Sequence, residues 1–425
     1  MDTRDPSFGE ALRFWLKLGF ISFGGPAGQI AIMHTELVDR KRWIGEERFL
    51  HALNFCMLLP GPEATQLAIY CGWLLHRTWG GIVAGVLFVL PAAVLLWGFS
   101  YVYVVHGNLP WVAAIFYGLK PAVTAIVAAA VIKIGRRALK TAWMWALAAI
   151  AFGLIYLLRV PFPLIIAGAA LIGWFAHRGT RPAEEAISPE MTRLDPRRNE
   201  TGWGRAAKVC VTCAVLWAAP ILVAGLTQGW RSTLVREGMF FSKAAMVTFG
   251  GAYAVLPYVA QHAVGQQSWL SAPQMLDGLG LAETTPGPLI MVVQFVGFLG
   301  GWNHPGGLQP IWAATLGAAI TTWTTFVPCF LWILLGAPHM ERLRRIARLN
   351  SALAAVTAAV VGVVLNLAVW FCQQTVWPGG ALDGFALLVA IAAFVGLTRF
   401  RIPVITIVIA SGMIGLLFRT WVPGW

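Results

Sequence analysis

The chain alternates between long apolar stretches and short polar loops. About 20 apolar residues suffice for a helix to cross a bilayer core about 30 Å thick. The predicted spans of the first half are residues 12–33, 49–75, 80–106, 110–134, 143–158 and 163–176. A lone span follows at 209–226, and the spans of the second half are 238–260, 273–301, 310–335, 350–371, 382–398 and 403–418. This pattern predicts an all-α polytopic membrane protein.

Two motifs that break helices occur twice in register. Phe23–Gly25 and Pro60–Pro62 return as Phe249–Gly251 and Pro286–Pro288, each 226 residues later. At the same displacement, four further residues recur: Phe14, Lys17, Trp43 and Leu53 match Phe240, Lys243, Trp269 and Leu279. The chain therefore contains an internal duplication of interrupted apolar segments, an arrangement with which many secondary transporters build a site near the bilayer midplane.

The spans divide the chain into four parts. Residues 1–176 form an N-terminal transporter half, 177–208 a polar cytoplasmic linker, 209–226 a connecting transmembrane helix, and 227–425 a C-terminal transporter half. Six spans and one connector precede the second set of six. The first half has an even number of spans, so the single connecting span places the start of the second half on the opposite side of the membrane. We therefore expect the second half to be an inverted repeat of the first.

The first two segments of each half are each broken about ten residues from their start. Ten helical residues rise about 15 Å, half the bilayer core, so each segment is a kinked span or a re-entrant hairpin. Loop 34–48 carries Arg40, Lys41, Arg42 and Arg48, whereas loop 261–272 carries no Lys or Arg. Hairpins would put the first loop inside and the second outside, as the positive-inside rule favours. We therefore favour hairpins over kinked spans.

The four breaks are the first candidate substrate site. Non-helical backbone at membrane depth is tolerated only where protein or water surrounds it. Each break begins a half-helix whose unpaired N–H groups and positive dipole end attract an anion. Ordinary proline kinks that only aid packing are the alternative. The predicted substrate-binding glycines are Gly24, Gly25, Gly61, Gly250, Gly251 and Gly287.

Three lysines within apolar segments are further candidates. Lys120 lies about eleven residues into its span, and an unpaired charge at mid-depth costs at least about 2.5 kcal/mol. Lys120 is therefore expected to bind a doubly charged anion, or else to form a structural ion pair. Lys17 and Lys243 are repeat counterparts one turn into their segments. They are predicted entrance cations on opposite faces, with snorkelling to the interface as the alternative.

Acidic and neutral polar residues also lie close to the breaks. Glu63 follows Pro62, and Glu283 precedes Pro286 by three residues. Either carboxylate could carry a proton for coupling, although Glu63 could equally cap its helix. The predicted hydrogen-bond donors to an oxyanion are Thr65, Gln66, Thr284 and Thr285. Their alternative role is to satisfy carbonyl groups freed by the breaks.

Composition and missing motifs exclude other classes. Hydrophobic residues make up 58% and charged residues 12% of 425 residues, against about 25% charged in soluble proteins. The net charge of +13 fits a bias towards cytoplasmic loops better than nucleic-acid binding. There is no ATP-binding Walker motif and no nucleophile elbow, and the histidines form no cluster at metal-ligand spacing. Cys210 and Cys213 have the spacing of a redox or metal pair, but they lie in an apolar run with no second pair and are interpreted as small buried apolar residues. We therefore expect no enzyme, metal or cofactor, and transport driven by gradients. A passive anion channel stays open, as does a homodimer.

Five motifs carry a resemblance to a known family. The whole chain resembles the long-chain members of the chromate ion transporter family of prokaryotes, which have two homologous halves. The matching motifs are Phe23–Pro26, Leu59–Ala64, Gly118–Ala122, Phe249–Tyr253 and Glu283–Pro288. The resemblance implies a multi-pass bacterial inner-membrane protein that exports chromate, driven by the proton gradient, and so confers chromate resistance. It also implies that sulfate-like dianions compete; the residues alone do not separate chromate from sulfate.

Overall fold

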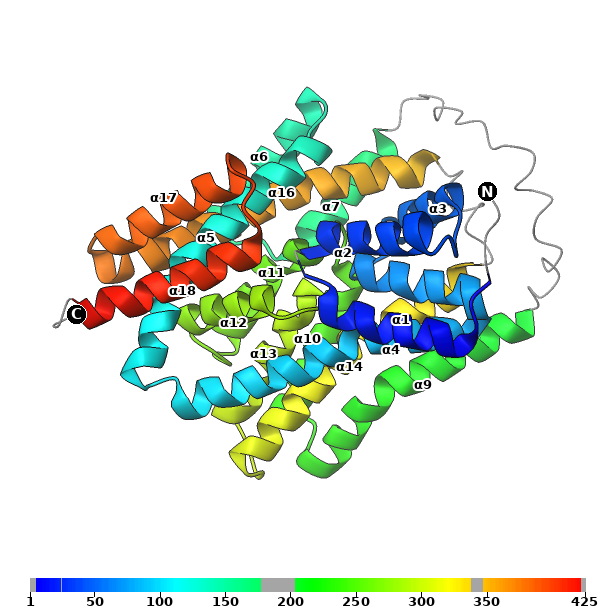
Figure 1. The fold of residues 1–425 in the computed structure, drawn as a ribbon, viewed down its shortest axis with the longest axis horizontal. Helices are drawn as coiled ribbons and strands as arrows, with labels where there is room; N and C mark the ends of the chain where they lie inside the picture. The colour runs from blue at the N-terminus through cyan, green and yellow to red at the C-terminus, as the bar shows by residue number, and fades with distance from the viewer. Residues whose placement is uncertain (1–4, 24, 177–202, 338–346, 422–425) are drawn as a thin grey trace.

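The computed structural model describes residues 5–23, 25–176, 203–337 and 347–421, whose regular elements are all helices (Figure 1). Six of the described helices are long and apolar enough to cross a membrane. They are α4 (Glu63–His106), α5 (Pro110–Ala138), α9 (Trp203–Gln228), α14 (Pro310–Gly336), α16 (Ala347–Val376) and α18 (Val404–Trp421). This agrees with the prediction of an all-α protein with many spans. The connecting helix α9 begins six residues before its predicted span, inside the stretch predicted as a polar linker.

Shorter helices and helical turns make up the rest of both halves, and those in the first part of each half are interrupted near the predicted breaks. In the first half they are α1 (Phe8–Ile21), α2 (Gly25–His34), the π-helical turn η1 (Thr35–Arg40), α3 (Glu46–Cys56), α6 (Ala142–Tyr156) and α7 (Phe162–Phe175). In the second half they are α10 (Thr233–Val247), α11 (Ala252–Ala260), η3 (Gln261–Gln266), α12 (Ala272–Thr284), η4 (Leu289–Met291), α13 (Val292–Asn303), η6 (Pro378–Gly380) and α17 (Gly384–Thr398).

The segment from α1 to η1 turns back on itself. The ammonium of Lys41, just after η1, lies 5.8 Å from the centroid of the Phe14 ring on α1. Trp43 packs edge-on against the same Phe14 ring at 5.3 Å. The chain therefore leaves along α1, reverses its direction between α1 and α2, and returns to the level of Phe14. Such a return describes a hairpin and not a kinked span.

Helix α3 runs to the second break, and α4 leads away from it in two arms. His76 and Arg77 have non-helical dihedral angles, so α4 is two helices joined by a sharp turn. The two arms pack closely because Gly72 and Gly80 face each other, and a methyl group on either would clash with the backbone of the other arm. His76 also hydrogen-bonds the Pro6 carbonyl at 3.1 Å, which brings the start of α1 to this turn.

The second half repeats this construction. Phe240 on α10 lies 6.0 Å from the Trp269 ring, as Phe14 lies near Trp43. The side-chain amide of Asn303 at the end of α13 donates to the Trp269 carbonyl at 2.8 Å. Helices α13 and α14 then pack as the two arms of α4 do, through Gly297 and Gly301. Both halves thus contain two hairpins and a glycine-lined helix pair.

The second arm of α4 and helix α14 hold the halves together in antiparallel directions. Gly85 packs against the Phe330 ring, whereas twelve residues later Trp97 donates to Thr315 at 3.1 Å. Buried apolar side chains form one core around the first-half hairpins and another around those of the second half. Helices α6 and α7 pack on α16, while α17 and α18 pack on α5. In the view of Figure 1, α9 lies on the opposite side of the molecule from α17 and α18.

Candidate functional site

Two crossed hydrogen bonds join the breaks of the two halves. The N–H of Gly61 donates to the Thr248 carbonyl at 2.7 Å, and the N–H of Gly287 donates to the Ser22 carbonyl at 2.8 Å. Gly61 and Gly287 are repeat counterparts, and so are Ser22 and Thr248. The second break of each half is therefore bonded to the first break of the other half.

Glycine is required at these breaks by backbone conformation. Gly61 and Gly287 have φ of 123° and 110°, and Gly250 and Gly251 have 80° and 94°, all in the region that side chains disfavour. A methyl group on Gly287 would also lie 2.6 Å from Cβ of Ala92. Gly25, at the start of α2, has φ of 67°. Gly24 lies outside the described residues.

The predicted coupling acids meet at the start of α11. A methyl group on Gly251 would lie 3.8 Å from Oε1 of Glu63, and the Tyr253 hydroxyl donates to Oε1 of Glu283 at 2.5 Å. The two acids come from different halves and are not repeat counterparts. Three of the four breaks therefore converge on the N-terminal end of α11, where unpaired N–H groups give a positive potential.

Helix α5 supplies cations to this region. Glu63 interacts electrostatically with Arg137, and Glu283 with Lys133, one helical turn away on the same helix. Neither pair is a direct ion pair among the described residues, since both separations exceed the contact distance of a salt bridge. The acids therefore lie within the field of α5 without being neutralised by contact.

Lys120, also on α5, forms an ion pair with Asp277 of α12. Its Nζ lies 3.7 Å from Oδ2 of Asp277, and the Tyr103 hydroxyl donates to the same oxygen at 2.9 Å. Asp277 is almost fully buried, whereas the Lys120 side chain is 27% exposed. The structural ion pair predicted as the alternative is thus present. The remaining exposure of Lys120 leaves room for a second, anionic partner.

The predicted hydroxyl and amide donors divide into two groups. Thr284 and Thr285 both donate to the Leu281 carbonyl, at 2.8 and 2.7 Å, so they serve the broken helix itself. Gln66 likewise donates to the Pro60 carbonyl at 2.7 Å. Thr65 differs, because its buried hydroxyl has no hydrogen-bond partner among the described residues. Of the four, Thr65 is the one whose hydroxyl is left for a ligand.

Gln29 was missed by sequence reasoning. Its side-chain amide donates to the carbonyl groups of Ser22 and Gly287, so it bridges two breaks from different halves. It is buried on α2, five residues after the first break. A lone glutamine in an apolar segment close to a break was the available signal.

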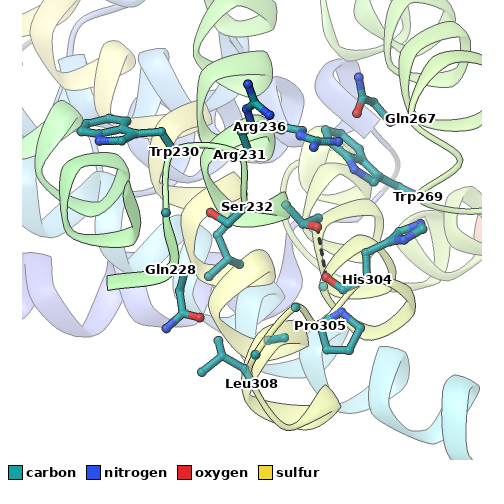
Figure 2. Close-up of a pocket in the computed structure, with 17 residues that line it drawn as sticks. Gln228, Trp230, Arg231, Ser232, Arg236, Gln267, Trp269, His304, Pro305 and Leu308 are labelled. Atoms are coloured by element: carbon teal, nitrogen blue, oxygen red, sulfur yellow. Dashed lines mark hydrogen bonds between the residues drawn. The ribbon is translucent and has the colours of Figure 1, made fainter. Parts of the chain in front are cut away.

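The predicted entrance lysines are both exposed, and they differ in their relation to the two cavities described here. A cavity of about 470 Å³ at the open end of the first hairpin is lined by Lys17, together with Arg13 and Lys41. A larger cavity, of about 760 Å³, opens at the corresponding end of the second half (Figure 2). Arg231, Arg236 and His304 line it, and Lys243 does not.

One surface cluster has the donor types of a metal site. His34, Asp39 and Glu46 offer ligand atoms within 4.8 Å of one another at the end of α2 and start of α3. Their sequence spacing had not suggested it, because η1 and the following loop fold Glu46 back to His34. His34 Nε2 lies 2.7 Å from a carboxylate oxygen of Glu46. This interaction between the two side chains accounts for the cluster without a metal ion.

Comparison with known proteins identifies the family. The profile described as chromate transporter matches residues 9–174 and 237–416, one segment in each half. The chain belongs to the chromate transporter family. It is 31% identical to the chromate transport protein of Pseudomonas aeruginosa, over 97% of this chain and 92% of that protein. It is 29% identical to the chromate transport protein of Cupriavidus metallidurans, over 96% and 92% of the two chains.

More distant relatives extend this picture. The probable chromate transport protein of Synechococcus elongatus is 25% identical over 97% of this chain and 96% of its own length. No solved structure matches the chain. The family consists of transporters and not of enzymes. The two segments of this chain that match the family coincide with the two halves that share the breaks. The residue roles within the site stay predictions.

Proposed function

We propose that this chain exports chromate across the bacterial inner membrane, coupled to the proton gradient, and thereby confers chromate resistance. Chromate is a tetrahedral oxyanion with two negative charges. Relatives that carry the name chromate transport protein cover nearly the whole chain and support this substrate. The membrane potential, negative inside, favours outward movement of a dianion by about 2.3 kcal/mol per charge per 100 mV.

An inverted arrangement of the two halves supports alternating access. The antiparallel pair of α4 and α14 has the turn His76–Arg77 near one end, since Gly85 meets Phe330 there. The loop before α14 lies near the other end, since Trp97 meets Thr315. The open ends of the two hairpin sets are then separated by about 20 helical residues, or about 30 Å, which is the thickness of a bilayer core.

The observation that carries the proposal is the pair of crossed bonds Gly61–Thr248 and Gly287–Ser22. These bonds consume the two glycine amides, so Gly61 and Gly287 hold the breaks together rather than bind the anion directly. The amides left for an oxyanion are those of the first turns of α2, α4 and α11 and of the 3-10 turn η4, which follows the second break of the second half. In this proposal Lys120 adds a full positive charge, Thr65 adds a hydroxyl donor, and Lys17 and Lys243 attract the anion at the two entrances.

Proton coupling is assigned in this proposal to Glu63 and Glu283. Both flank the start of α11, where the dianion is expected to bind. A carboxylate beside a dianion is repelled unless it takes up a proton, so the protonation state of the two acids makes chromate binding depend on the pH of the side to which the site is open. Replacing both acids by glutamine should therefore remove the response of chromate flux to a pH gradient.

The decisive experiment is uptake of radiolabelled chromate into proteoliposomes containing the full chain. We expect saturable uptake that sulfate inhibits and that Lys120→Ala abolishes while the protein stays inserted. Non-saturable flux would indicate a passive channel instead. Flux that survives Lys120→Ala would remove this lysine from the site. Light scattering on the same preparation separates a monomer from the homodimer that we propose.

A further inference from the structure

Glu237 on α10 is a buried carboxylate that the site above does not use. Its side chain has no solvent exposure, and neither carboxylate oxygen has a hydrogen-bond partner among the described residues. The residue that the duplication aligns with it is Ala11. A buried charge without a partner is among the least tolerated groups in a protein or a membrane, so this acid needs an explanation.

Two glycines make the space that Glu237 occupies. A methyl group on Gly300 of α13 would clash with its Oε1, and one on Gly317 of α14 would lie 2.8 Å from its Oε2. The carboxyl group is thus inserted between the backbones of α13 and α14. These are the helices that form the glycine-lined pair of the second half.

Among the residues that the structure describes, no cation forms an ion pair with this carboxylate. Helices α13 and α14 contain no Lys, Arg, His, Asp or Glu within their bounds. On α10 itself Arg236 and Lys243 are exposed, and on α9 the basic residues Arg205 and Lys208 lie near its opposite end. Tyr253, Tyr258 and His262 of α11 and η3 make other contacts: with Glu283, with Phe162 and with Phe240. Glu237 is thus fully buried without a hydrogen-bond or salt-bridge partner among the described residues.

A route to water lies directly beside this acid. The cavity of about 760 Å³ is lined by Trp269 and Gly301, and the Trp269 ring would contact a methyl group on Gly300, next to Oε1 of Glu237. Figure 2 shows the cavity between the Arg231–Arg236 turn and the His304–Leu308 loop. Among the described residues, the lining includes Arg231 and Arg236 and no Asp or Glu, so the positive potential of the cavity favours the charged carboxylate of Glu237 once water reaches it.

We propose that Glu237 is a second proton-binding site, occupied in the closed packing of α10, α13 and α14 and emptied into the cavity when these helices separate. The inference rests on the proposed transport function. A proton suits the site better than a metal cation, because Na⁺ or Ca²⁺ requires several oxygen ligands and Glu237 is surrounded by glycine backbone and an indole ring. Opening the helix pair to water is what permits the charged form.

The test uses the full chain with Glu237→Gln, which imitates the protonated acid, and Asp5→Asn as a control that removes an exposed carboxylate. Infrared spectra at neutral pH should contain a protonated-carboxyl band that Glu237→Gln removes and Asp5→Asn leaves. In proteoliposomes, Glu237→Gln should lose part of the chromate-driven proton movement recorded by a dye inside the vesicles, while chromate exchange at equal concentrations continues.

Each result bears on the proposal separately. An unchanged carboxyl band, or unchanged proton movement in Glu237→Gln, overturns it. Charge movement that follows sodium instead of pH, and that Glu237→Gln abolishes, also overturns it in favour of a sodium site. If Glu237→Gln does not fold, Glu237→Met replaces it. Its melting temperature should be no lower than that of the unmodified chain, because the substitution removes a polar group without a partner. A lower melting temperature would mean that Glu237 has a partner in the folded protein. If the unmodified chain shows no chromate flux but Glu237→Gln still removes the protonated-carboxyl band, the transport function is rejected and the proton site is kept.

Discussion

The two halves of the chain keep the same breaks but not the same charges. Both have glycines with positive φ at corresponding positions, and each lends one amide to the other in the crossed bonds. By contrast, Glu237 corresponds to Ala11, Glu63 to Leu289 and Glu283 to Met57. The duplicated feature is therefore backbone geometry, and the features that differ are ionisable side chains.

This difference separates two requirements of the proposed function. A pair of hairpins needs a break in both halves, because the crossed bonds need one donor and one acceptor from each. A proton-binding site or an ion pair needs to be present only once in the molecule. One copy of a duplicated ionisable side chain can therefore be lost without loss of the function that it serves. Among the described residues, the buried acids Glu237, Asp277, Glu283 and Asp383 all lie in the second half, while α5 of the first half supplies Lys120.

The largest effect is expected from glycine substitution at the crossed bonds. Gly287→Ala should reduce chromate transport at least about tenfold, because a side chain at φ 110° costs roughly 1–3 kcal/mol and its methyl group meets Ala92. Gly61→Ala should cost less, because its nearest neighbour is the flexible amide of Gln66. Initial rates of uptake in proteoliposomes measure both.

The matched control is Gly98→Ala on α4, where nothing lies within 4 Å of the added methyl group. It should leave transport unchanged. Equal losses from Gly98→Ala and Gly287→Ala would mean that the breaks are not special, and that glycine substitution harms the helices in general.

Sequence patterns could predict the breaks because they depend on residue type along the chain. Proline, paired glycine and a constant displacement of 226 residues identify them without knowledge of contacts. The ends of α1, α3, α10 and α12 accordingly fall at the predicted positions. The hairpin shape followed from charge: four basic residues in one loop and none in its counterpart.

Pairings between distant helices could not be predicted in the same way. Asp277 lies on an apolar helix with no sign in its local sequence that Lys120 is its partner, 157 positions earlier. Glu237 is preceded by Arg236 and has the local pattern of a helix end near the membrane surface. Its complete burial arises from Gly300 and Gly317, which approach only when α13 and α14 pack. Such contacts depend on packing rather than on periodicity.

The next largest effect concerns the Lys120–Asp277 pair. Asp277→Asn should lower both the melting temperature and the transport rate, because it removes the partner of a partly buried cation. Combining it with Lys120→Gln should restore the melting temperature without restoring transport, if Lys120 also binds the anion. Tyr103→Phe, which removes one hydrogen bond to Asp277, is the milder control.

Restored transport in the Lys120→Gln, Asp277→Asn variant would show that the pair is only structural. The anion would then be held by helix ends alone, and the asymmetry between the halves would have less functional meaning. Thermal unfolding in detergent and uptake in vesicles should be measured on the same preparations.

A smaller effect is expected from the threonines near the breaks. Thr65→Val should weaken chromate binding several-fold, because its hydroxyl has no other partner among the described residues and one hydrogen bond makes a net contribution of about 0.5–1.5 kcal/mol. Thr285→Val should change binding little, because its hydroxyl already donates to Leu281. Half-saturating concentrations distinguish the two, and a larger loss from Thr285→Val would reverse the assignment.

The smallest effect should come from the cations at the two cavities, and it should depend on the side of the membrane. Neutralising Arg231 and Arg236 should raise the half-saturating chromate concentration about two- to fivefold from the side on which their cavity opens, since exposed charges steer anions but are screened by salt. Neutralising Arg13 and Lys17 should do the same from the opposite side. Raising ionic strength should remove both differences. Vesicles of defined orientation are needed, and the same side dependence for both pairs would contradict the inverted arrangement of the halves, because the two cavities would then open to one face.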